Sequence, residues 1–142
     1  MNSTTQATAE HPLREAMLAH IEHNLREPEL GIESLQTCFG VSRATVYRIF
    51  HNVGGVHSHI RERRLQAAHR HLRQFPDCNL TWLLYEIGFG SERQFQRAFQ
   101  THFAMAPSEW KRRCLQSAPA DAPGAIPRYT RLWPQQVVHQ LA

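Results

Sequence analysis

Two arginines, Arg48 and Arg97, occupy equivalent places in a motif that occurs twice along the chain. The guanidinium group is a planar fork of donors that fits phosphate oxygens and the O6 and N7 acceptors of guanine. Each Arg lies six residues after a serine, Ser42 or Ser91, with an apolar residue at +4 and a Phe at +8. This spacing indicates a helix that buries one face and presents an arginine on the other, as nucleic-acid-binding helices do.

The residues before each serine repeat as well, which predicts a second helix in each copy. Ile32 and Leu35 match Leu80 and Leu83 at an offset of 48 residues, and a glycine-containing turn follows in both copies. A short helix, such a turn and a second helix form a helix-turn-helix. The repeat therefore predicts two helix-turn-helix units, each placed to contact one stretch of DNA major groove.

Apolar periodicity and capping residues predict the helices of the whole chain. Ser91 and Gln94 predict a capping box before the sixth helix. The fourth helix is expected to be the longest, with an inward stripe of Ile60, Leu65, Ala68 and Leu72. No strand-like alternation is present, so we expect an all-α fold: two helix-turn-helix subdomains joined by a long linker helix, about seven helices in all. The expected helices span residues 12–26, 32–39, 43–50, 56–74, 80–87, 92–102 and 108–113.

The chain is expected to have four parts. They are an N-terminal helix-turn-helix subdomain over 11–55, a linker helix over 56–75, a C-terminal helix-turn-helix subdomain over 76–116 and a proline-containing tail over 117–142. Half of the eight prolines lie in the tail, which predicts a flexible segment from Ser117 to Pro127. The apolar residues around Trp133 are candidates to dock on the domain or on a partner.

The net charge of +4 hides a strong asymmetry. Residues 1–40 carry a net charge of −4, whereas residues 41–113, which contain the second half of the first motif and all of the second, carry +7. The basic residues are almost all Arg, which fits nucleic-acid binding, with a coding bias toward Arg as the alternative explanation. The linker-helix arginines spread around their helix, so some are expected to pair with acids of the first helix, among Glu15, Glu22 and Glu27.

Several classes of protein are not expected. No run of ~18 apolar residues is present, and the first ten residues are polar without an apolar signal core, so we expect a cytoplasmic protein with no membrane partner. No nucleophile elbow, phosphate-binding loop, zinc-protease motif or pair of carboxylates indicates an enzyme, and no cofactor is expected.

A metal site is not expected either. The ten histidines lack a completing cysteine or carboxylate pair, and they are expected to be surface residues of helices. Cys38, Cys78 and Cys114 are widely spaced, and we expect free thiols that serve in packing.

Residues 11–113 resemble the DNA-binding domain of AraC/XylS-type transcriptional regulators. The resemblance extends back to Arg64, Leu65, Ala68 and Leu72 and to Ser42, Arg48 and Phe50. The segment that carries it is Gly88-Phe89-Gly90-Ser91, then Phe95, Arg97, Phe99 and Phe103, then Pro107-Ser108-Glu109-Trp110-Lys111.

The resemblance implies seven helices, of which the third and sixth enter successive major grooves of a double-stranded DNA operator, with RNA polymerase as a second candidate partner. The chain departs from the family pattern at Gln36 and Leu84, where the family usually has Ala, and at Ala104, where Gly is common. Bulky residues at the first two positions are expected to alter helix packing. Only about ten residues precede the first expected helix, so no small-molecule sensor domain is expected in this chain.

The candidate DNA-binding residues follow from exposure on a recognition helix. Arg48 matches the family's base-contacting arginine, and Arg97 is its counterpart. Tyr47 is a candidate to lie against a thymine methyl or a sugar, with a half-buried structural aromatic as the alternative. Glu92 is a candidate to accept a hydrogen bond from cytosine N4, with favourable placement at a helix N-terminus as the alternative. The first recognition helix offers Arg43, Ala44, Tyr47 and Arg48, the second offers Glu92, Arg93, Gln96 and Arg97, and the phosphate candidates are Ser42, Ser91, Arg112 and Arg113.

The function that these patterns predict is sequence-specific binding of double-stranded DNA by a transcription regulator. The alternative is a helical protein-interaction module, or the DNA-binding fragment of a longer regulator, with weak DNA reading of its own.

Overall fold

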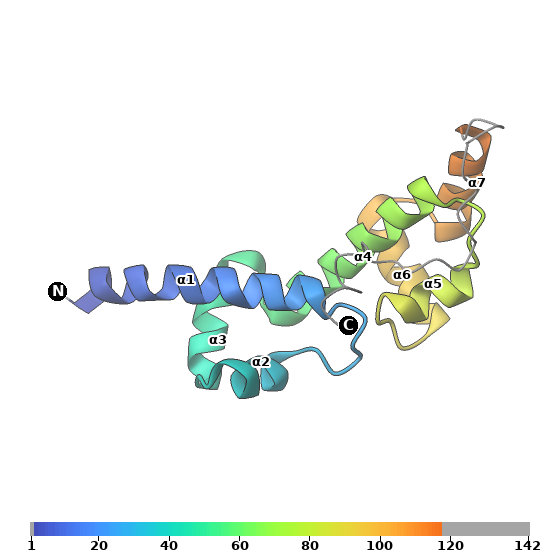
Figure 1. Cartoon of the computed structure of the whole chain (residues 1–142). Coiled ribbons are helices and arrows are strands. Elements are labelled where there is room, and N and C mark those ends of the chain that lie inside the picture. The colour runs from blue at the N-terminus through green and yellow to red at the C-terminus, as the bar shows by residue number, and fades with distance from the viewer. Residues whose placement is uncertain (1, 118–142) are drawn as a thin grey trace, which may run out of the picture. The chain divides into compact units, whose positions relative to one another are not determined.

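A computed structural model describes the backbone of residues 2–117 and the side chains of residues 12–117. The described residues form seven α-helices, one 3₁₀ turn and no strands, which confirms the predicted all-α class (Figure 1). The expectations for the tail after Ser117 lie outside the described residues. The helices are α1 (Asn2–His23), α2 (Ile32–Phe39), α3 (Arg43–Phe50), α4 (Val56–Gln74), α5 (Leu80–Glu86), α6 (Glu92–Phe103) and α7 (Pro107–Ser117), with the 3₁₀ turn at His51–Val53.

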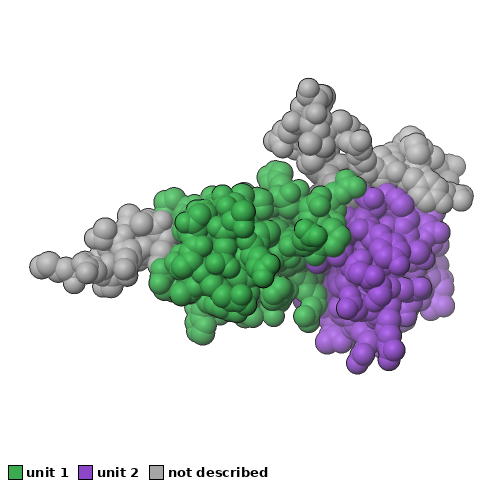
Figure 2. Space-filling view, turned by 90° about the horizontal axis from the view of Figure 1, so that it is seen from below, with its two compact units in different colours: residues 1–63 green, residues 64–142 purple. Residues whose placement is uncertain are grey.

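The chain divides into two compact units, residues 1–63 and 64–142, and the boundary falls inside α4 (Figure 2). The first unit contains the helix-turn-helix of α2 and α3, and the second contains that of α5 and α6. The finer division at residues 55, 75 and 116 stays a prediction.

The core of the first unit is apolar and comes from α1, α2 and α3. Met17, Ile21 and Leu35 are fully buried, as are Val46 and, within one per cent, Phe50. The residues on one side of each helix are therefore removed from water, and the other side of α3 is left on the surface.

The first helix differs from its prediction. The apolar spacing predicts a helix over residues 12–26, but α1 spans Asn2–His23 and Pro12 lies inside it. The helix therefore continues through a residue without a backbone N–H. At 22 residues α1 is longer than α4 at 19, so the expectation that the linker helix is the longest was wrong.

The core of the second unit is rich in aromatic rings. Phe95 and Phe99 of α6 are buried and their centroids lie 5.6 Å apart. The last helix runs to Ser117 rather than to Arg113, because Cys114 is buried and extends its inner face by a further turn. Two polar contacts hold α7 in this unit: Trp110 Nε1 donates to the backbone carbonyl of His69 at 3.1 Å, and Lys111 Nζ donates to that of Cys78 at 2.7 Å.

Two expectations about polar side chains were wrong. His71 is not a surface histidine: it is 3% exposed and lies beside the rings of Phe75 and Trp82. Cys38 does not pack in the core but is exposed, whereas Cys78 and Cys114 are buried as expected. Burial raises the pKa of the Cys78 thiol to about 11, so this thiol stays protonated and serves as a small apolar group.

The turns that end α2 and α6 each contain one residue in the left-handed conformation, but this residue is a glycine in one turn and an alanine in the other. Gly40 has φ 63° after α2, and Ala104 has φ 60° after α6. The backbone N–H of each donates to a carbonyl four residues earlier, Gln36 or Gln100, at 2.9 Å. A side chain with a Cβ is strained in this conformation, whereas glycine is not.

This difference predicts opposite effects of exchanging the two residue types. Ala104→Gly should raise the free energy of unfolding by about 0.5–1 kcal/mol, because released strain exceeds the added entropy of the unfolded chain. Gly40→Ala should lower it by about 1 kcal/mol through strain alone, since no atom lies within 4 Å of the added Cβ. Gly90→Ala is the control: φ is not positive there, the nearest atom is 3.6 Å away, and little change is expected. Urea denaturation measures all three, and a destabilised Ala104→Gly variant would contradict the argument.

The burial of His71 predicts a loss of stability in mild acid. Burial lowers the pKa of His71 from 6.5 to about 4, and its Nε2 has no hydrogen-bond partner within the described residues. The unfolded chain takes up a proton near pH 6.5 and the folded chain only near pH 4, so stability falls as the pH drops through this range, by about 3 kcal/mol at most. Urea denaturation from pH 7 to 4.5 should show a shallower decline for His71→Leu than for the wild type. Parallel curves would show that the imidazole is not buried in its neutral form.

Candidate nucleic-acid interface

The first recognition helix, α3, is fixed by its cap and by its buried face. Ser42 lies just before it, and the hydroxyl of Ser42 accepts a hydrogen bond from the backbone N–H of Thr45 at 3.2 Å. Val46, Ile49 and Phe50 are buried. The candidate residues on the opposite face are all exposed, as predicted from the helical spacing: Arg43, Ala44, Tyr47 and Arg48.

Two of these residues contact each other, which the sequence analysis did not anticipate. Nη2 and Nε of Arg43 lie 3.2 and 3.4 Å from the hydroxyl oxygen of Tyr47, and its guanidinium carbon lies 5.5 Å from the ring centroid. Tyr47 is 49% exposed, so it lies on the candidate surface rather than in the core. The i, i+4 spacing of the pair is the sequence signal that could have revealed it.

The second recognition helix, α6, has the same construction. The Ser91 hydroxyl accepts from the backbone N–H of Gln94 at 3.2 Å. The reciprocal bond of the predicted capping box, from the Ser91 backbone to the Gln94 side chain, is not formed among the described residues, so that prediction was half right. Phe95 and Phe99 are buried. The exposed face carries Glu92, Arg93, Gln96 and Arg97, as predicted.

A side-chain contact also joins two residues of this face. Nε2 of Gln96 donates to Oε1 of Glu92 at 3.2 Å, again at i, i+4 spacing. Glu92 lies in the first turn of α6, where the helix dipole favours a negative charge. The carboxylate is therefore both a helix-terminal charge and an acceptor on the exposed face.

The helix-turn-helix closes in both copies despite the bulky residues where the family usually has Ala. The carbonyl of Gln36 accepts from the backbone N–H of Gly40 at 2.9 Å and of Val41 at 3.3 Å. The carbonyl of Leu84 accepts from Phe89 at 2.9 Å, and the Leu84 side chain is 1% exposed. Both turns thus keep their backbone hydrogen bonds around these larger side chains.

The phosphate candidates on α7 differ in their surroundings. Arg112 and Arg113 are both exposed. Nη2 of Arg113 lies 3.2 Å from Oε1 of Glu109, a surface ion pair of the helical i, i+4 type. Part of the charge of Arg113 is therefore balanced within its own helix.

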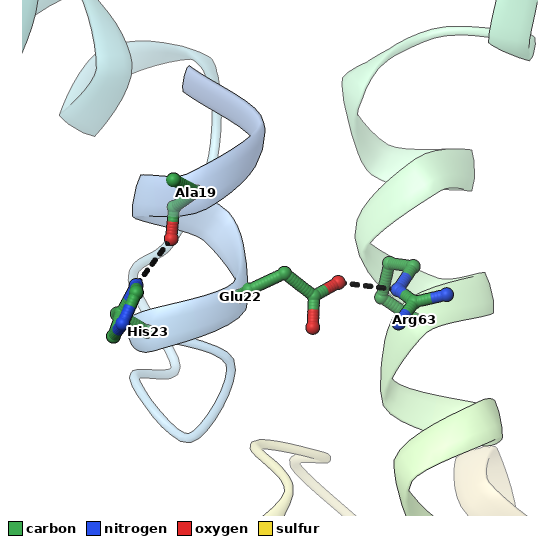
Figure 3. A network of polar contacts seen from close by, with 4 residues as sticks. All are labelled: Ala19, Glu22, His23 and Arg63. Carbon is green, nitrogen blue, oxygen red and sulfur yellow. Dashed lines mark hydrogen bonds and ion pairs between the residues drawn. The ribbon is translucent and has the colours of Figure 1, made fainter. Parts of the chain in front are cut away.

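An ion pair inside the first unit joins the acidic N-terminal part of the sequence to the basic part that follows it. Nε of Arg63 forms an ion pair with Oε1 of Glu22, which confirms the expectation that an acid of the first helix pairs with a linker arginine (Figure 3). One turn before Arg63, burial and the charge of Arg63 lower the pKa of His59. Arg63 therefore stabilises this unit and is not a first choice for a DNA contact.

The described residues offer little to other ligand classes. They contain no group of three or more His, Cys, Asp or Glu side chains placed to hold a metal ion. Within the same part of the chain, no helix combines the length and apolarity that crossing a membrane requires.

A family model described as a helix-turn-helix domain matches residues 35–113, more than half of the chain. The match runs from α2 into α7 and contains both recognition helices. No match was found among curated proteins or among solved structures. With its two capped helix-turn-helix units, the chain belongs to the AraC-type helix-turn-helix family of DNA-binding transcription regulators.

Proposed function

We propose that this chain binds double-stranded DNA sequence-specifically, with α3 and α6 entering successive major grooves of an operator. The observation that carries the proposal is the equivalence of the two helices: each follows a capping serine, buries its +4 and +8 residues and exposes an arginine at +6. Major grooves on one face of B-DNA recur about every 34–36 Å. One chain with two such helices can therefore contact an asymmetric site.

The exposed residues divide by the groups that they would contact. Arg48 and Arg97 would donate to base edges, and guanine is the base whose O6 and N7 fit a guanidinium. Ser42 and Ser91 lie at the helix N-termini, where phosphates are favoured. Arg112 and Arg113 would contact phosphates from α7. A regulator of this kind acts where the chromosome lies, so the proposal also places the protein in the cytoplasm, where RNA polymerase is a candidate partner.

Replacing the two equivalent arginines tests whether each helix contacts its own bases. Arg48→Ala should weaken binding to the preferred site by about 1–3 kcal/mol and relax base preference in one half of the site. Arg97→Ala should do the same in the other half, and the two losses should add because the contacts are separate. Selection from a random-site DNA pool with each variant in parallel measures both effects.

Other outcomes of this selection would change the proposal. If both variants lose preference at the same base positions, only one groove is contacted. If the wild type selects no sequence at all, the chain is better described as an interaction module than as a sequence-specific regulator.

Salt dependence tests the phosphate contacts. Affinity for the preferred site should fall by orders of magnitude between about 50 and 200 mM salt, because several phosphates are neutralised. Arg112→Gln should reduce the log–log salt slope by about one unit without altering base preference. Arg113→Gln should reduce it less, because Glu109 already balances part of that charge. Fluorescence anisotropy across a salt series measures the slopes, and a flat wild-type affinity would remove the DNA-binding proposal.

A further inference from the structure

We propose that Glu92 and Gln96 act together as an acceptor pair that selects a base with an exocyclic amino group in the major groove. The inference rests on the proposed DNA-binding function and names the base chemistry that α6 recognises. The amino group is N4 of cytosine or N6 of adenine, the two major-groove donors of DNA.

The geometry of the pair fixes how the amide of Gln96 is presented. Its Nε2 donates to Oε1 of Glu92 at 3.2 Å. A carboxylate offers only acceptors, so the amide must turn its nitrogen toward Glu92 and its oxygen away. Both residues are exposed, and the Gln96 oxygen and the remaining lone pairs of Glu92 are thus open to an outside donor.

The chemistry of these atoms discriminates among bases. Facing an amino group, the oxygens of Glu92 and Gln96 share the one N–H that base pairing leaves open to the major groove. Facing O6 and N7 of guanine or O4 of thymine, the acceptors meet acceptors, and the carboxylate loses water without gaining a partner. Rejection of the wrong base in this way contributes to specificity as much as attraction of the right one.

The two recognition helices differ in the hydrogen-bond donors and acceptors that their exposed faces carry. The exposed face of α3 carries Arg43, Tyr47 and Arg48 and no acid. The Nε and Nη2 edge of Arg43 faces Tyr47, and donors remain on its other edge. The face of α3 therefore suits acceptor-rich bases, whereas α6 places an acceptor pair among its arginines.

A simple helix-terminal role for Glu92 would not account for this arrangement. Glu109 occupies the first turn of α7 and pairs with an arginine, Arg113, which balances its charge. Glu92 instead contacts a neutral amide, so its negative charge persists on the proposed DNA-facing surface. There it repels phosphates and weakens binding to every sequence unless a base donor compensates.

Glu92→Gln and Glu109→Gln form a matched pair of test variants, because each removes one charge from the first turn of a helix. In selection from a random-site pool, the wild type should show one position in the α6 half restricted to cytosine or adenine. Glu92→Gln should reduce that preference about tenfold and bind unselected DNA more tightly. Glu109→Gln should also bind unselected DNA more tightly and should keep the preference. Gln96→Ala should weaken the preference at the same position.

Base analogues then identify the donor. If adenine is selected, purine, which lacks the 6-amino group, should weaken wild-type binding about tenfold. If cytosine is selected, 2-pyrimidinone, which lacks the 4-amino group, should do so. Either analogue should change the affinity of Glu92→Gln much less than that of the wild type.

The outcomes separate this inference from the proposed function. If Glu92→Gln melts like the wild type and selects the same bases, Glu92 acts only at the helix terminus and the inference is overturned. The same holds if the position selects guanine or thymine. If the wild type itself shows no salt-dependent, sequence-selective binding, the proposed function fails instead.

Discussion

The burial of the apolar residues four and eight places after each capping serine is the constraint on which the candidate interface depends. Val46 and Phe50 in α3, and Phe95 and Phe99 in α6, are at most 1% exposed. Burying side chains of this size stabilises the fold by about 1.5–3 kcal/mol each, more than a typical surface ion pair does. Since the rotation between residues of a helix is fixed, holding these positions inward leaves the +1, +5 and +6 positions outward. The exposed faces of both helices are thus set by packing within each unit, before any ligand is present.

The caps then set where each face begins. Ser42 and Ser91 satisfy an N–H of the first turn, and Gly40 and Ala104 close the helices α2 and α6 in the left-handed conformation. A one-residue slip of a helix start would rotate every side chain by about 100° and, in α6, would bring Gln94 or Gln96 to the buried position of Phe95. Ala104 follows the C-terminal end of α6, opposite the Ser91 cap, and its left-handed conformation is strained for a residue with a Cβ. The surrounding unit therefore imposes this backbone conformation, which alanine itself does not favour.

Sequence reasoning succeeded where local rules govern. The bounds of α2, the cap at Ser91 and the buried stripe of α4 follow from spacing and from cap chemistry, and the structure confirms them. It was wrong where tertiary surroundings decide. The burial of His71 depends on the rings of Phe75 and Trp82, and the extension of α7 depends on the burial of Cys114. For the candidate interface the sequence predicted which side chains are exposed, but not that they pair as Arg43 with Tyr47 and Gln96 with Glu92. Such pairs are weak, and rotamer choice selects them among several neighbours.

Side-chain pairs within the chain also lower the affinity for DNA phosphates that the number of arginines alone would suggest. The basic charge of residues 41–113 would all count toward phosphate binding if every arginine faced the duplex. Arg63 is instead balanced by Glu22, Arg113 is partly balanced by Glu109, and one edge of Arg43 is turned to Tyr47. The net charge of +7 for these residues already subtracts Glu92 and Glu109, and the pairing of Arg63 with Glu22 lowers the charge left for non-specific attraction further. A protein that limits its general attraction to phosphate in this way depends more on base contacts to hold its site, since specificity is the difference between its affinities for the right and the wrong sequence.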